Sequence, residues 1–209
     1  MSGTHGALRM IELASARLYH DINGLMGSLD HALSASANGS RDDPDLQTSA
    51  LDTGKTLIAR LKLRRAAWTP DDQPVPVAQI KALGGGLPDH VTVDVSTLAP
   101  GTVFPASAGR IVLNLLLLAA DSLPAGGIVM LAGSADDLFI RIAGPAAAWP
   151  AGMALCFADE MAARSALMEQ RSLQMALTAL LARAAGIRLS LLLSPTAETE
   201  PAILRLGGA

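Results

Sequence analysis

Hydrophobic residues in the first third of the chain recur at helical spacing. From residue 8 to residue 35, isoleucine or leucine returns every three or four positions over much of the segment, which predicts one long helix. Asn38-Gly39-Ser40 interrupts the pattern, and Asp43-Pro44 opens a second helix that is expected to run to about Trp68. Two such helices form an antiparallel hairpin. Because a lone hairpin buries little apolar surface, we expect two copies to pair as a four-helix bundle in a homodimer.

A different pattern follows a polar, proline-rich segment at residues 69–76. This segment predicts a boundary between a helical-hairpin domain at residues 1–70 and a second domain at residues 77–209. In the second domain short alternating or apolar runs predict strands, and longer apolar runs predict helices. Helices on one face of a mixed sheet form an α/β sandwich, so the chain as a whole is expected to be α+β. The predicted strands lie at 91–95, 128–132, 138–142, 187–193 and 202–206, and the predicted helices at 106–123 and 173–185.

Composition narrows the function classes. Half of the 209 residues are hydrophobic and only 3% are aromatic, so the core consists of aliphatic side chains and methionine. The net charge of −3 argues against a nucleic-acid partner. Cys156 is the single cysteine, which excludes an intramolecular disulfide and fits a reducing cytoplasm. No signal peptide is recognisable, and no apolar run approaches the ~20 residues of a membrane helix, so we expect a cytoplasmic protein that does not contact membranes.

One histidine lies on the polar side of the first predicted helix. With a turn of about 100° per residue, His20 lies about 200° from the apolar stripe that contains Leu18. Gly24 and Gly27 share its side of the helix, although a glycine inside a helix costs roughly 0.5–1 kcal/mol relative to alanine. Close approach of a partner backbone to His20 would account for both glycines. Ordinary helix packing would account for them too, and an exposed histidine is commonly just a solvated side chain.

The run Ala16-Arg17-Leu18-Tyr19-His20-Asp21-Ile22-Asn23 resembles the phosphoacceptor box of histidine-kinase dimerisation helices. It is closer still to the ChpT-type histidine phosphotransferases of alphaproteobacteria, and Gly27 also matches. Residues 110–120, followed by 123–127, resemble the N-box helix of the kinase ATPase domain in its ChpT-like form. Residues 181–189 resemble the last helix and strand of that domain. The three resemblances occur in the family's order along nearly the whole chain.

The departures from an active kinase are as informative as the matches. The N-box of a kinase carries a second, metal-binding asparagine four residues after the first, and here Asn114 is followed at that place by Leu118. The adenine-reading Asp-x-Gly-x-Gly loop would fall at 142–145, where no carboxylate occurs. The glycine-rich lid would fall at 172–174, where no glycine occurs. The resemblance therefore implies a degenerate Bergerat-type (GHKL-like) domain that binds neither ATP nor any other cofactor.

The resemblance implies a histidine phosphotransferase of a two-component phosphorelay. The imidazole of His20 would accept a phosphoryl group from one receiver-domain aspartate and pass it to another, and Asp21 would orient the imidazole. The partners would be receiver domains of response regulators and of a hybrid histidine kinase, with Mg²⁺ held by the receiver and no metal site in this chain. The residues expected to face the partner are Leu13, Ala16, Arg17, Gly24 and Gly27.

Three alternatives remain open from the sequence. His31, about three turns beyond His20 on nearly the same side of the helix, is a rival phosphoacceptor with flanks that do not match the box. The chain could instead be a non-catalytic pseudo-histidine-kinase that docks on a kinase or response regulator and inhibits it. It could also be an enzyme of the wider ATPase superfamily with an unrecognised nucleotide site, although the missing carboxylates argue against that.

Overall fold

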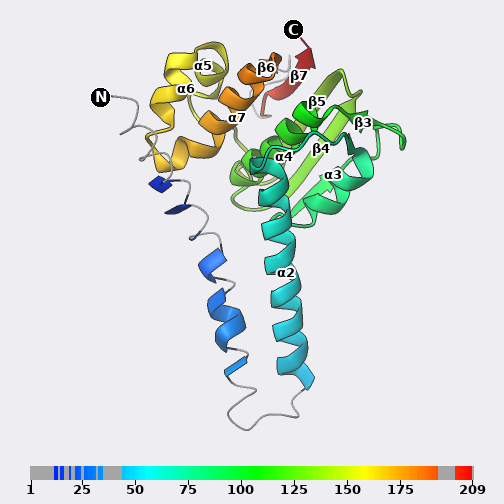
Figure 1. The fold of residues 1–209 in the computed structure, drawn as a ribbon, viewed down its shortest axis with the longest axis vertical. Helices are drawn as coiled ribbons and strands as arrows, with labels where there is room; N and C mark the ends of the chain where they lie inside the picture. The colour runs from blue at the N-terminus through cyan, green and yellow to red at the C-terminus, as the bar shows by residue number, and fades with distance from the viewer. Residues whose placement is uncertain are drawn as a thin grey trace.

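A computed structural model describes residues 12–13, 15–16, 19, 22–24, 26–31, 33–34, 44–192 and 201–208. All the described residues between 12 and 34 are helical, as the periodicity predicts. The rest of the described chain contains both helices and strands (Figure 1). The helices are α2 Pro44–Trp68, α3 Val77–Gly84, α4 Ala106–Asp121, α5 Met153–Ala158, α6 Glu160–Ala166 and α7 Leu173–Ala184, with a 3₁₀ turn at Gln170–Ser172. The strands are β1 Val75–Pro76, β2 Val91–Asp94, β3 Val103–Phe104, β4 Gly127–Gly133, β5 Asp137–Ala143, β6 Ile187–Leu192 and β7 Ile203–Gly208.

The main sheet is mixed and has five strands in the order β2-β4-β5-β7-β6. Only β2 and β4 are parallel, and the other neighbours are antiparallel. A tight turn joins β4 to β5, where Gly133 has a φ of 106° and Ser134 donates its backbone N–H to the carbonyl of Asp137. The short strands β1 and β3 form a separate antiparallel pair.

One face of the sheet is buried and the other is largely open. Side chains at alternate positions of the central strands are buried, which is the pattern of a sheet covered by helices on one side. On the opposite face, Arg205 of β7 donates two hydrogen bonds to Asp137 of β5 and lies 5.8 Å from the centre of the Phe139 ring. This arrangement confirms the expectation of a mixed α and β domain. The buried residues are Val129, Leu131, Leu138, Ile140, Ile142, Leu189, Leu204 and Leu206.

Helix α4 is the centre of the hydrophobic core. Eleven of its sixteen residues are buried, and it contacts α2, α3, α7 and the sheet. A helix that is apolar on nearly every side needs partners all round, and here it has them. The helix ends at Asp121 with Ser122 as its C-cap, shortly before Pro124. The chain then enters β4 through Gly126 and Gly127, which both have positive φ.

Helix α2 extends away from the sheet, and only its C-terminal end packs against the rest of the chain (Figure 1). Leu63 and Ala67 are fully buried and belong to the same core cluster as α4. Gly86, in the loop after α3, lies so close to α2 that a Cβ there would collide with the carbonyl oxygen of Ala59. The last turns of α2 are therefore packed into the core of the C-terminal part, although the sequence places a domain boundary after residue 70.

Most predicted elements are present within a few residues of their expected ends. The periodicity does not predict α3, α5, α6 or the strand pair β1–β3, all of which are eight residues or shorter. Elements this short carry too few turns or alternations to produce a recognisable period. Within the described residues, no helix combines the length and apolar character that crossing a bilayer requires.

Candidate functional site

The predicted phosphoacceptor segment is described only in part. His20, Asp21 and Arg17 lie outside the described residues. Ala16, Gly24 and Gly27 are helical and exposed, as the sequence analysis expects of a face open to a partner. The rival phosphoacceptor His31 is also helical and exposed.

The two glycines of this face have open space beside them. A Cβ built at Gly24 or Gly27 would meet no other described atom within 4 Å, so packing against the described part of the protomer requires neither glycine. The Ser28 hydroxyl donates a hydrogen bond of 3.0 Å to the backbone carbonyl oxygen of Gly24, one helical turn earlier. The segment thus keeps two residues that weaken a helix at a place where its described surroundings leave room for larger ones.

Leu13 differs from the other predicted partner-facing residues. Its side chain is only 5% exposed and packs with Leu167, Leu173 and Ala176 at the α6–α7 corner. The expectation that Leu13 shares the exposed surface is therefore wrong in this structure. The reason is tertiary: residues of α7 and of the segment before it cover the Leu13 side chain, which helical periodicity alone cannot reveal.

Asn114, the asparagine of the N-box-like run, is fully buried and makes structural hydrogen bonds. Its side-chain Nδ2 donates to the carbonyl oxygen of Ala67 at 2.6 Å and to that of Arg110 at 2.9 Å. The Arg110 guanidinium adds bonds to Ala67 at 3.1 Å and to Trp68 at 2.7 Å. The last carbonyls of a helix lack partners within the helix, so these two side chains of α4 cap the end of α2.

Gln174 lies in the first turn of α7, within the segment where the sequence resemblance predicts the lid of a kinase. It is 6% exposed, and its Nε2 donates to the side-chain Oδ1 of Asn114 at 3.0 Å and to the backbone carbonyl of Asn114 at 3.2 Å. It also bonds Thr178 Oγ1 at 3.3 Å, and that hydroxyl donates back to the Gln174 carbonyl at 2.7 Å. This network joins α4 to α7 through the protein's own buried side chains.

The sequence does not predict this network, because residues 172–174 stand out there only for the absence of glycine. The signal present in the sequence is a glutamine set between Leu173 and Met175 in an apolar helix, followed one turn later by Thr178. Buried polar side chains of this kind are nearly always hydrogen-bonded, so the pattern predicts a buried partner but cannot name it.

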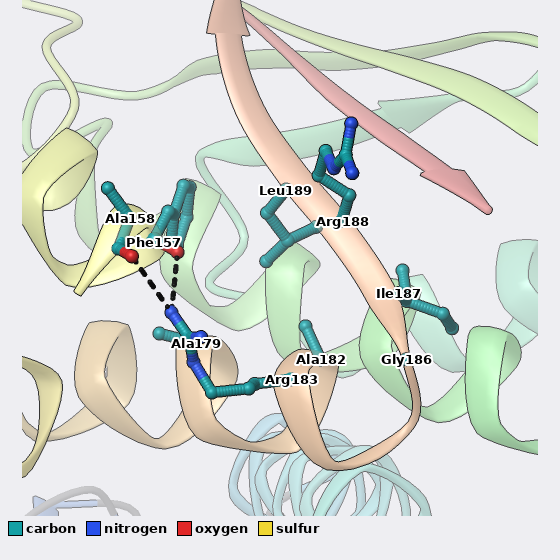
Figure 2. Close-up of a pocket in the computed structure, with 9 residues that line it drawn as sticks. All are labelled: Phe157, Ala158, Ala179, Ala182, Arg183, Gly186, Ile187, Arg188 and Leu189. Carbon is teal, nitrogen blue, oxygen red and sulfur yellow. Dashed lines mark hydrogen bonds between the residues drawn. The ribbon is translucent and has the colours of Figure 1, made fainter. Parts of the chain in front are cut away.

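A surface cavity of about 400 Å³ lies between the end of α7, the start of β6 and α5 (Figure 2). Arg183 reaches across it and donates hydrogen bonds of 3.2 and 3.1 Å to the backbone carbonyls of Phe157 and Ala158. The other lining side chains are mainly apolar, with Arg188 at the margin. None of the described residues that line the cavity carries a carboxylate or a nucleophile, and Arg183 closes the end of α5 much as Arg110 closes the end of α2.

The described part of the chain brings no three histidine, cysteine, aspartate or glutamate side chains together in a possible metal site. Cys156 is buried on α5, and burial, with a smaller contribution from the charge of Glu169, raises the pKa of its thiol. A raised pKa leaves less thiolate at neutral pH, which is the opposite of what a nucleophilic cysteine needs.

Comparison with known proteins places the chain in a family. The model of the histidine phosphotransferase C-terminal domain family matches residues 77–197, which is more than half of the chain. The solved structure of a bacterial phosphotransferase is 23% identical, with a TM-score of 0.67 over 96% of both chains. The cytoplasmic segment of the histidine kinase QseC is 17% identical, with a TM-score of 0.39 over 80% of this chain and 96% of that one. No curated protein matches the chain in sequence.

The chain therefore belongs to the histidine phosphotransferase family. The resemblance to the ChpT-type members, drawn from the phosphoacceptor box and the degenerate N-box, is confirmed. Family membership gives the chain a phosphotransfer role and makes the proteins of two-component systems its class of partner.

Proposed function

We propose that this protein shuttles phosphoryl groups between receiver-domain aspartates through His20. A neutral imidazole nitrogen attacks the phosphorus of an aspartyl phosphate in line, the phosphorus–oxygen bond to the aspartate breaks, and the carboxylate leaves. The reverse reaction on a second receiver returns the imidazole. Little covalent assistance is needed, so catalysis rests on positioning and on charge stabilisation by Mg²⁺ held in the receiver. Asp21 orients the imidazole.

The open space at Gly24 and Gly27 is the observation that carries the proposal. These glycines lie four and seven residues after His20, and about one and two helical turns separate them from it. No described atom of the protomer occupies the space beside them, yet each costs the helix stability. A surface that must admit another protein's backbone accounts for this cost, because transfer to His20 requires a receiver to approach within bonding distance. Exposed Ala16, which also has a small side chain, extends the same surface.

We further propose that the first helix and α2 form a hairpin and that two copies make a four-helix bundle. Exposed apolar side chains recur at seven-residue spacing on both segments: Tyr19, Met26 and Leu33 on the first, and Leu51 and Ile58 on α2. Between 39% and 64% of each of these residues and of Leu61 is exposed. Their repeat along the helices, rather than any single exposure, indicates a surface that another helix could cover. A seven-residue repeat is the pattern of helices that pack along a shared seam.

The C-terminal part, in this proposal, is a degenerate GHKL-like domain that binds no ATP. The support is the use of the N-box and lid positions for internal bonding. Asn114 is bonded to α2 and to Gln174, Leu118 is buried and apolar, and 142–145 carries no carboxylate. A nucleotide would have to break this network before reaching the polar atoms of α4.

Phosphoryl transfer from a radiolabelled, phosphorylated receiver domain tests the proposal directly. We expect label to appear on the wild-type protein, to be absent from His20→Ala, and to persist on the matched variant His31→Ala. Label that survives in His20→Ala but is lost in His31→Ala would move the site to the rival histidine. A wild-type protein that binds receivers but never acquires label would instead be the inhibitory pseudo-kinase.

A further inference from the structure

The first turn of α7 contacts two other regions of the molecule at once. Leu173 and Ala176 are three residues apart and face the same way, toward Leu13 at the start of the first helix. Gln174 is rotated by about 100° from Leu173 and faces α4. One helical turn therefore has an apolar side against the first helix and a polar side against the N-box-like helix.

The polar side continues to the end of α2 through a chain of buried hydrogen bonds. Gln174 donates to Asn114 Oδ1 at 3.0 Å, and Asn114 donates to the Ala67 carbonyl at 2.6 Å. Asn114 is 0% and Gln174 6% exposed, so neither bond competes with bulk water. A buried network whose members are all satisfied favours one arrangement of its helices, because any other leaves polar groups unpaired.

The C-terminal part thus holds the first helix and α2 at separate points. The contact with the first helix is Leu13 in its apolar cluster. The contact with α2 comprises buried Leu63 and Ala67, the close approach of Gly86, and the cap on the carbonyls at the end of the helix. A single contact would allow the C-terminal part to pivot, whereas two contacts on different helices remove that freedom.

We infer that Asn114 and Gln174 are positioning residues: they fix the C-terminal part in one orientation against both N-terminal helices. These two residues form a joint between the two parts of the chain, at positions whose sequence context resembles the N-box and lid of a kinase.

The orientation matters for transfer because the joint borders the surface near the phosphoacceptor. Exposed Ala16 follows buried Leu13 by three residues, a rise of about 4.5 Å along the helix. The orientation of the C-terminal part therefore sets how much space a partner finds beside Ala16. This step rests on the proposed phosphotransfer function, whereas the existence of the joint does not.

The fluorescence of Trp68 can report whether the joint is intact, independently of phosphoryl transfer. The carbonyl of Trp68 accepts the bond from Arg110, and the indole N–H is buried with no acceptor among the described residues. Trp149, the only other tryptophan, is hydrogen-bonded to Ala202, far from α2 in sequence. In full-length Trp149→Phe protein, the emission of Trp68 reports whether water reaches the end of α2.

We expect Asn114→Ala in this background to shift the Trp68 emission to longer wavelength and to raise its acrylamide quenching several-fold, with the far-ultraviolet circular dichroism unchanged. Gln174→Met, which keeps the side-chain volume, should give a smaller shift of the same sign. Ser122→Ala is the matched control: it removes a buried hydrogen bond of α4 that stays within that helix, and it should leave the emission unchanged.

Phosphotransfer kinetics supply the second reading. We expect Asn114→Ala to raise the KM for a phosphorylated receiver about tenfold while kcat stays near wild type, and Ser122→Ala to change neither. Unchanged Trp68 emission in both Asn114→Ala and Gln174→Met would overturn the joint even if transfer proceeds. A shifted emission in a protein whose wild type never accepts phosphate would keep the joint and reject the phosphotransfer proposal. A fall in kcat with unchanged KM would overturn the positioning role.

Discussion

Helices α2 and α4 lie against each other but differ in how much of their apolar surface the chain itself buries. In α4, eleven of sixteen residues are buried, and every apolar side has a partner within the chain. In α2, Leu63 and Ala67 are the only buried side chains among those described, while Leu51 and Ile58 remain more than half exposed. The comparison shows that this chain completes one helix internally and leaves the other to be completed by something else.

This difference in burial separates the residues that stabilise the fold from those that are free to contact a partner. In the C-terminal part, the side chain of Asn114 is occupied by hydrogen bonds to Gln174 and to the Ala67 carbonyl. The N-terminal helices keep open glycines and exposed apolar side chains. Changes at the buried apolar positions of α4 should therefore act mainly on stability, and changes in the N-terminal helices on association and transfer.

The largest expected effect is on the stability of α4. Leu116 is 0% exposed, and Leu116→Ala should lower the free energy of unfolding by about 2–5 kcal/mol because it opens a cavity in a packed core. Urea denaturation followed by circular dichroism measures the change. Leu51→Ala, at a position 64% exposed, is the comparison and should change the stability of the isolated protomer by less than about 1 kcal/mol. Equal losses in both would contradict the contrast between the helices.

Self-association is expected to depend on α2. Ile58→Glu places a charge in the apolar seam of the proposed bundle and should weaken the dimer by about 100-fold or more. Sedimentation equilibrium measures the dissociation constant. Ser49→Glu adds the same charge at an exposed position on the opposite side of α2 and serves as the control. A wild-type protein that stays monomeric at high concentration would remove the bundle from the proposal.

A smaller effect is expected at the open glycines. Gly24→Ala should raise the stability by roughly 0.5–1 kcal/mol, since the helix gains propensity and the methyl group meets no described atom. The same methyl group occupies space that a receiver needs, so transfer should slow about tenfold. Ser34→Ala, exposed and further along the helix, should leave transfer unchanged. Faster or unaltered transfer in Gly24→Ala would show that the open space has no part in docking.

The smallest effect concerns the closed interior. Burial raises the pKa of the Cys156 thiol, so less thiolate is present at pH 8 than in a free cysteine. Alkylation by iodoacetamide at that pH should be at least about tenfold slower in the folded protein than in urea. Rapid alkylation of the folded form, followed by mass spectrometry, would show that α5 opens easily.

Periodicity sufficed to predict the long elements, because α2, α4 and the β4–β5 pair each repeat their pattern several times. It also placed Ala16, Gly24 and Gly27 on an exposed face. It failed at Leu13, whose burial depends on residues about 150 positions away in the sequence. Periodicity could not predict the contact between Asn114 and Gln174 for the same reason. A sequence shows which polar residues lie among apolar ones, but tertiary packing decides which of them become partners.

The contact between Gly86 and the carbonyl of Ala59 limits where two proteins of this kind could be joined in a chimera. A glycine with its α-carbon pressed against a helix backbone leaves no space for any side chain, so the loop and the helix fit as a matched pair. A chimera that joined this C-terminal part to a foreign hairpin at the proline-rich segment 69–76 would replace one half of that pair. A better junction lies earlier, ahead of Ala59, so that the last turns of α2 stay with the helices α3 and α4 that they pack against.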